Sequence, residues 1–190
     1  EQIDCQGVRN VEGGVSGVAL IVVDANSQNT IVVVPGTNAC LVSQDIDACD
    51  SALQKADVIV CQLEVPMSTV GYTLDRGRAL NKTVILNPAP ASGPLPVEWY
   101  DAVDYLIPNE SEAQALSGVV VDSLDSAELA ARTLMGFGAG KVIVTLGAQG
   151  ALFVSEQRAM HFAAPKVLAV DATAAGDTFV GAFSAALAAG

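Results

Sequence analysis

The stretch VIVCQLEVPMSTVGYTLDRGRALNKTVIL, residues 58–86, decides the fold. It opens with a continuous apolar run at Val58–Leu63, and the pattern then predicts a helix over Pro66–Leu80 with its proline near the start. A second apolar run follows at Thr83–Leu86. Strands that are apolar along their whole length, with a helix between them, are typical of a parallel sheet covered on both faces.

The same alternation continues along the chain. We expect helices over Ser43–Lys55, Asn109–Gly118, Asp125–Met135 and Asp177–Ala189, and strands over Tyr105–Ile107, Val142–Leu146 and Ala151–Val154. Ahead of them, Gly17–Asp24 and Thr30–Pro35 are rich in β-branched residues and are joined by the polar link Ala25–Asn29, which predicts a hairpin. The predicted fold class is α/β, with three layers, a mostly parallel sheet between helices and a small separate β element.

Composition excludes several classes of function. The 190 residues carry a formal net charge of −12, which argues against a nucleic-acid surface. The sequence contains no uninterrupted stretch of 18 apolar residues, so no membrane span is predicted, and the first residues do not resemble a signal peptide. The single histidine, His161, argues against a histidine-based triad or a multi-histidine metal site and is expected to be structural or on the surface. The four cysteines show no CxxC spacing, so we expect reduced thiols and a cytoplasmic protein: Cys5, Cys40, Cys49 and Cys61.

The stretch VDATAAGDTFVGAF, Val170–Phe183, carries the strongest functional signal. Ala174, Ala175 and Gly176 have almost no side chain, so a ligand can approach the backbone closely. The helix that follows offers free N–H groups and a partial positive charge, which together form an anion hole. Asp177 at its edge is placed to accept a proton from an attacking hydroxyl. The residues alone leave open a simpler reading, in which Asp177 only caps the helix and the small residues only allow tight packing.

Other glycine-rich stretches give weaker signals. The chain has no GxxxxGK[ST] motif, so a P-loop is not expected. GFGAG, Gly136–Gly140, follows a predicted helix rather than a strand, and is interpreted as a helix stop.

VDATAAGDTFVGAF resembles the carboxyl-terminal signature of the PfkB-type carbohydrate kinases, the ribokinase-like superfamily, whose usual form is DTxGAGD. Ala172 and Ala174 stand where that form has Thr and Gly. Further motifs occur in the family's order and spacing, and the first of them resembles the ribokinase branch in particular: VVVPGTNA (Val32–Ala39), VIVCQLEVP (Val58–Pro66), NPAPA (Asn87–Ala91), PNESEA (Pro108–Ala113) and VIVTLGAQGA (Val142–Ala151). The resemblance covers essentially the whole chain.

The resemblance implies a role for each matching residue. Asp177 would be the catalytic base on the sugar's primary hydroxyl, and the backbone N–H groups of Ala174, Ala175, Gly176 and Asp177 would stabilise the transferred phosphoryl group. Glu64 matches a sugar-contacting glutamate, although from the residues alone it reads as a solvated loop carboxylate.

The resemblance also implies the nucleotide and metal sites. The nucleotide would lie against Asn109, Gly176 and the loop Thr145, Leu146, Gly147, Ala148, Gln149 and Gly150, which also reads as a hairpin turn. Glu112 would belong to the outer shell of a magnesium ion, although Asn109 and Glu112 also have the spacing of a capping box. Asp171 and Thr173 match ligands of a potassium ion, whose remaining ligands come from beyond the last helix in the family.

The resemblance implies a division into residues 1–38, part of a β lid with its connections, and residues 39–190, the α/β core. It implies an ATP-dependent kinase that phosphorylates the 5-hydroxyl of D-ribose, uses Mg²⁺ and K⁺, and pairs as a homodimer through the lid. Alternatives are another sugar or nucleoside kinase of the superfamily, such as a fructokinase or adenosine kinase, and a non-catalytic sugar- or nucleotide-binding regulator. Family members are longer at both ends, so we expect these residues alone to have little kinase activity.

Overall fold

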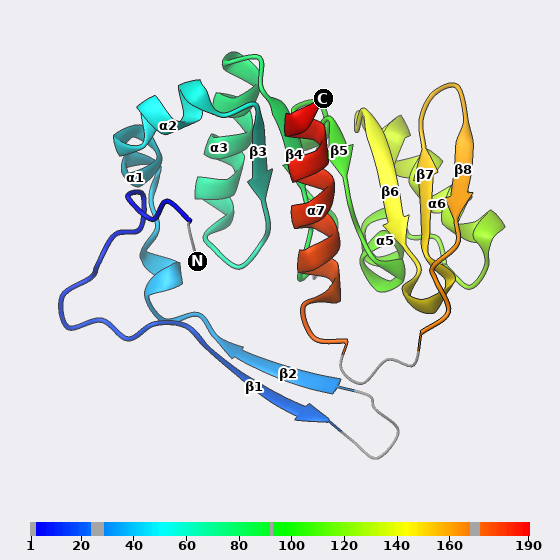
Figure 1. The fold of residues 1–190 in the computed structure, drawn as a ribbon, viewed down its shortest axis with the longest axis horizontal. Helices are drawn as coiled ribbons and strands as arrows, with labels where there is room; N and C mark the ends of the chain where they lie inside the picture. Colours follow the sequence, from blue (N-terminus) through cyan, green and yellow to red (C-terminus); the bar gives the residue numbers. More distant parts are fainter. Residues whose placement is uncertain (1–2, 24–28, 92, 168–171) are drawn as a thin grey trace.

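A six-stranded sheet forms the centre of the computed structural model, which describes residues 3–23, 29–91, 93–167 and 172–190. The strands follow one another in sequence order across the sheet (Figure 1). They are β3 (Val58–Cys61), β4 (Thr83–Leu86), β5 (Tyr105–Leu106), β6 (Lys141–Thr145), β7 (Ala151–Val154) and β8 (Ala159–Phe162). Strands β3 to β6 are parallel, while β7 and β8 continue the sheet as antiparallel strands. The predicted α/β class with a mostly parallel sheet is therefore confirmed.

Helices cover both faces of this sheet, as the apolar strands predict. The larger core lies between the sheet and four helices: α3 (Met67–Ala79), α4 (Val97–Tyr100), α5 (Glu110–Ser117) and α6 (Leu124–Gly136). On the opposite face α7 (Ala175–Ala189) packs Val180 against the sheet residues Ile85, Ile107 and Ile143 (Figure 1). The core thus has three layers: four helices on one face, the sheet in the middle, and α7 on the other face.

Four elements differ from the prediction. The helix expected over Ser43–Lys55 is divided into α1 (Ser43–Ala48) and α2 (Asp50–Lys55), because Cys49 leaves the helical conformation at φ −97°, ψ 12°. The helix α4 and the strand β8 were not predicted, since each has only four residues and neither shows a clear period. The last helix begins at Ala175, two residues before the predicted start.

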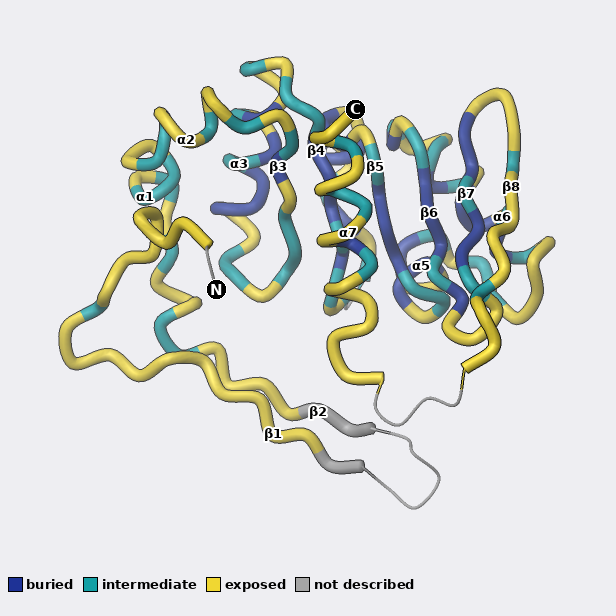
Figure 2. Tube along the Cα trace, viewed as in Figure 1, coloured by how far each residue is buried: buried dark blue, intermediate teal, exposed yellow. Residues whose placement is uncertain are grey.

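A separate two-stranded sheet stands apart from the core (Figure 1). It consists of β1 (Val18–Val23) and β2 (Asn29–Val34), which pair antiparallel as the sequence predicts. A short 3₁₀ helix, Gly36–Cys40, connects it to α1. Apolar side chains such as Leu20 and Val34 are exposed on it. Figure 2 colours the described part of this sheet as exposed. The division into domains at residue 38 stays a prediction.

The cysteines and the helices agree with the expectations from composition. All four cysteines are free, and burial raises the pKa of the Cys61 thiol to about 12, so this thiol stays protonated. Among the described residues, every helix is too short or too polar to cross a membrane.

Candidate active site

The carboxyl ends of the four parallel strands meet along one edge of the sheet, and polar or glycine residues follow each of them. Glu64 lies in the loop after β3, Asn87 directly follows β4, Asn109 comes after β5, and Gly147 comes after β6. In open α/β sheets ligands bind beyond the carboxyl ends of the strands. The candidate site is therefore this edge, together with the amino end of α7 that lies over it (Figure 1).

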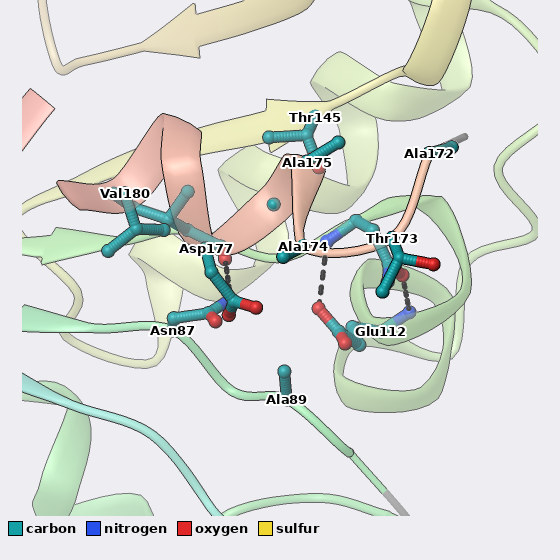
Figure 3. A pocket seen from close by; sticks show the side chains of 13 residues that line it. Asn87, Ala89, Glu112, Thr145, Ala172, Thr173, Ala174, Ala175, Asp177 and Val180 are labelled. Carbon is teal, nitrogen blue, oxygen red and sulfur yellow. Dashed lines mark hydrogen bonds between the residues drawn. The ribbon is translucent and has the colours of Figure 1, made fainter. Parts of the chain in front are cut away.

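A small cavity of about 180 Å³ lies between the sheet edge and the start of α7 (Figure 3). Asp177 enters it from α7 and Glu112 from α5. The lining brings together segments from four separate parts of the chain: Asn87, Ala89, Ile107, Asn109, Glu112, Thr145, Ala172, Thr173, Ala174, Ala175, Gly176, Asp177 and Val180. The acid and the small residues that the sequence singled out therefore face one cavity and are not plugged by large side chains.

The start of α7 has an unusual backbone. Ala174 is the N-cap residue and lies in the left-handed region at φ 59°, which is rare for a residue other than glycine. The Ala175 N–H donates to the Ala172 carbonyl at 3.2 Å, and the Thr178 N–H donates to the Ala174 carbonyl at 2.9 Å. Within the described chain, the N–H groups of Ala174, Gly176 and Asp177 have no acceptor. These N–H groups are available to an anion.

Asp177 is not the helix cap. It is the third residue of α7, and the backbone turn at Ala174 takes the capping position with no side-chain bond. The Asp177 side chain is exposed and, among the residues that the structure describes, pairs with no other group. Its carboxylate is consequently available to a ligand in the cavity.

Asn109 and Glu112 form a capping box at the start of α5. The Asn109 side-chain oxygen accepts the Glu112 N–H at 2.8 Å, and a Glu112 carboxylate oxygen accepts the Asn109 N–H at 2.9 Å. The capping reading is therefore confirmed. Burial raises the pKa of the Glu112 carboxyl, and the hydrogen bond from the Asn109 backbone opposes this rise. One carboxylate oxygen of Glu112 remains available on the side of the cavity.

The described residues offer two carboxylates to a metal ion at this site. In the described ranges, no group of three His, Cys, Asp or Glu side chains gathers where it could hold a metal ion. The cavity contains two carboxylates, Glu112 and Asp177, whose oxygens suit a hydrated magnesium ion carried by phosphate groups. Of the predicted potassium ligands, Thr173 lines the cavity, while Asp171 lies outside the described residues.

A second, larger cavity of about 520 Å³ adjoins the first. The two share Asn109, Thr145, Ala175 and Gly176. Most of the remaining lining is apolar: Ala151, Phe162, Ala163, Ala164, Pro165 and Phe179, beside Glu110, Gly147 and Gly150. We call it the apolar cavity.

The predicted nucleotide loop is only partly on these cavities. Thr145, Gly147 and Gly150 line the apolar cavity, whereas Leu146 is buried beneath the loop and lines neither of the two. Ala148 and Gln149 are exposed and also line neither. The hairpin reading of the loop is confirmed, because β6 and β7 pair antiparallel across it.

Glu64 is not brought together with Asp177. It is exposed in the loop after β3 and lines neither cavity. Glu64 lies at the same carboxyl edge of the sheet as the two cavities.

Several lining residues were not predicted as site residues. Asn87 follows a predicted strand in the NPAPA motif, a signal that could have identified it. Its side-chain N–H donates to the Ile107 carbonyl at 2.8 Å, which links the ends of β4 and β5. The segment Phe162–Pro165 carried no comparable signal, because it enters the site through the unpredicted strand β8.

Comparison with known proteins places the chain in a family. The model of the pfkB family carbohydrate kinases matches residues 1–190. Deoxyribokinase of Salmonella typhi is 41% identical over 169 residues, which are 89% of this chain and 55% of that protein. The crystal structure of ribokinase from Thermotoga maritima has a TM-score of 0.80 at 41% identity and covers 93% of this chain and 58% of its own.

A third relative was solved with ligands. The structure of Arabidopsis thaliana ribokinase complexed with ribose and ATP has a TM-score of 0.81 at 26% identity, over 94% of this chain and 58% of that one. The chain thus spans little more than half the length of these relatives. Because the family model matches along all 190 residues, the chain belongs to the pfkB family of carbohydrate kinases.

Proposed function

We propose that the protein transfers the γ-phosphoryl group of ATP to the 5-hydroxyl of D-ribose. The observation that carries this proposal is the Asp177 carboxylate, which has no partner among the described residues and faces the same cavity as free N–H groups at a helix start. A base beside an anion hole is the arrangement that phosphoryl transfer to an alcohol needs.

In the proposed step Asp177 accepts the proton of the hydroxyl while the hydroxyl oxygen forms a bond to the γ-phosphorus. The bond between that phosphorus and the bridging oxygen of ATP breaks, and ADP leaves with the negative charge. The N–H groups of Gly176 and Asp177 donate to the oxygens of the group in transit. Losing one such donor typically costs about 3 to 4 kcal/mol of transition-state stabilisation.

The two adjoining cavities suit the two parts of ATP. The apolar cavity, about 520 Å³ in volume, is of a size and chemistry to take the base and sugar of the nucleotide. The shared lining at Thr145, Ala175 and Gly176 leads from there to Asp177. This path orders the nucleotide with its phosphates toward the anion hole. The Arabidopsis relative, which was solved with ribose and ATP, supports the same pair of ligands.

Both cations belong to the proposal. A magnesium ion would neutralise charge on the phosphates when bound, and Glu112 would hold its water ligands through the free carboxylate oxygen. Asp171 and Thr173 would contribute oxygens to a potassium ion, a role that rests on the resemblance to the family. Neither ion is assigned a further role in the transfer step.

The sugar is proposed to lie between Asp177 and the loop that holds Glu64, with Glu64 accepting hydrogen bonds from its hydroxyls. A second candidate substrate is 2-deoxy-D-ribose, because a deoxyribokinase and a ribokinase are both 41% identical to the chain. We also propose that the exposed apolar strands β1 and β2 cover the sugar site and pair two copies of the protein.

The test is ADP formation by the full-length protein with ATP and a panel of ribose, 2-deoxyribose, fructose and adenosine. We expect the highest kcat/KM with ribose, and phosphate at the 5-oxygen of the product by NMR. A higher kcat/KM with 2-deoxyribose would select the second candidate. Turnover only with fructose or adenosine would overturn both, and ligand binding without turnover would indicate a regulator.

A further inference from the structure

The loop between β6 and β7 is held in a demanding conformation. Gly147 and Gly150 have positive φ values of 51° and 100°, and the residues between them form a single 3₁₀ turn. Its backbone hydrogen bonds are internal: Leu146 N–H to the Gly150 carbonyl at 2.8 Å, and Gln149 N–H to the Leu146 carbonyl at 2.9 Å. These bonds shape the loop. Backbone pairing with β8 begins only after it, where Ala151 pairs with Phe162, so Gly147–Gln149 lie outside the β7–β8 ladder.

His161 on β8 adds a side-chain attachment at Gln149, within the part of the loop that the ladder does not hold. Its Nε2 lies 2.7 Å from the backbone carbonyl oxygen of Gln149. A carbonyl oxygen only accepts hydrogen bonds, so Nε2 carries the proton and donates. Elsewhere in the described chain, no side chain hydrogen-bonds to the loop Gly147–Gly150.

The next residues of β8 lie against the same loop. A side chain at Gly150 would overlap the Phe162 carbonyl and the backbone of Ala163 and Ala164. Phe162, Ala163 and Ala164 also line the apolar cavity, opposite Gly147 and Gly150. The His161 bond therefore joins the two walls of this cavity, one from the loop and one from the end of β8.

We propose that His161 is a positioning residue of the nucleotide site, which sets the distance between the loop Gly147–Gly150 and the wall Phe162–Ala164 through its bond to the Gln149 carbonyl. The proposal rests on the proposed function, since it assigns the apolar cavity to ATP. His161 touches the loop and not the ligand, so it acts on nucleotide affinity and not on the transfer step.

The position of His161 distinguishes this role from support of the sheet. β8 is an edge strand whose backbone already pairs with β7, with His161 opposite Leu152. The imidazole is exposed and reaches past this pairing to Gln149, three residues before Leu152. Replacing the His161 imidazole leaves the backbone pairing of β7 and β8 intact and removes the side-chain hydrogen bond to the loop at Gln149.

The experiment compares His161→Leu, which removes the donor, with His161→Gln, which keeps a side-chain N–H donor, in the full-length protein. Met160→Leu is the matched control, because its side chain points to the opposite face of the same strand. The dissociation constant of ADP is measured by calorimetry, KM for ATP and for ribose by steady-state kinetics, and the unfolding midpoint by thermal denaturation.

We expect His161→Leu to raise the ADP dissociation constant and KM for ATP about 2- to 10-fold, the range of one net hydrogen bond. KM for ribose, kcat and the behaviour of Met160→Leu stay unchanged, and His161→Gln restores most of the affinity. Equal affinity of His161→Leu and wild type would overturn the inference, as would an equal loss in the Leu and Gln variants. Failure of the wild type itself to bind ADP would instead overturn the proposed function.

Discussion

Replacing Asp177 by asparagine separates a catalytic carboxylate from a structural one. The substitution keeps the size of the side chain and removes its charge. Asp177 is exposed, is the third residue of α7 and has no side-chain partner in the described chain. The only structural loss is therefore the attraction between a negative charge and the helix start, about 0.3–1 kcal/mol of the free energy of unfolding.

The catalytic loss is expected to be much larger. A positioned general base contributes about 10²- to 10⁴-fold in rate, which corresponds to about 3 to 5 kcal/mol of activation free energy. Asp177→Asn should therefore lower kcat by at least about 100-fold. The dissociation constant of ATP should change little, because the N–H donors and the apolar cavity remain.

Asp125→Asn provides the matched control. Asp125 is also an exposed acid in the first turn of a helix, α6, and it lies away from both cavities. Urea unfolding should show similar small losses of stability for the two variants, and coupled ADP formation should show a loss of turnover for Asp177→Asn alone. Asp177→Asn with more than a tenth of wild-type kcat would refute the assignment of the base.

Four further substitutions test the site and the fold. Gly176→Ala should fold normally, because the added methyl group meets no protein atom within 4 Å. The variant should raise KM for ATP, since Gly176 lines both cavities. An unchanged KM for ATP would contradict a close approach of the phosphates to this backbone. Burial raises the pKa of Glu112 above its ordinary 4.5, so its stabilising effect is present below that pH and is lost as the pH rises through the folded-state value. In urea unfolding, wild type should thus lose stability relative to Glu112→Gln as the pH rises above about 4.5, and the opposite trend would be inconsistent with burial. Gly71→Ala places a methyl group 2.7 Å from Trp99 Nε1 and should cost about 1–3 kcal/mol, whereas Gly181→Ala on α7 meets no atom and should be neutral or stabilising by up to about 1 kcal/mol.

The order of the core elements was predictable because their signals are local and repeat. The apolar runs at Val58 and Thr83 predict strands, and the structure places β3 and β4 there. β4 is largely buried, whereas the edge strand β3 leaves Val60 exposed. The helix from Asn109 to Gly118 was predicted closely, since Asn109 caps its start and Gly118 ends it at φ 74°. The break at Cys49 could not be predicted in the same way, because no glycine or proline marks it.

The candidate site was predictable in its residues but not in its geometry. The small residues before α7 indicate close backbone approach, yet nothing in the sequence shows that Ala174 takes a left-handed conformation and starts the helix early. For Glu64 the sequence predicted the edge of the sheet but not the distance from the cavity. Its place after a strand predicts the correct edge of the sheet, while its distance from the cavity depends on how the loop turns.

The order of the strands gives the proposed reaction a direction along the sheet edge. Glu64 follows β3 at one side, Asn87 and Asn109 follow the central strands β4 and β5, and the loop Gly147–Gly150 follows β6. The proposed sugar, phosphate and nucleotide contacts therefore succeed one another in space in the same order as in the sequence. It follows that substitutions after β3 should alter KM for the sugar, those after β6 KM for ATP, and replacement of Asp177 at the start of α7, which lies between them, kcat. A substitution in the loop after β6 that changed only KM for the sugar would break this order and with it the placement of both substrates.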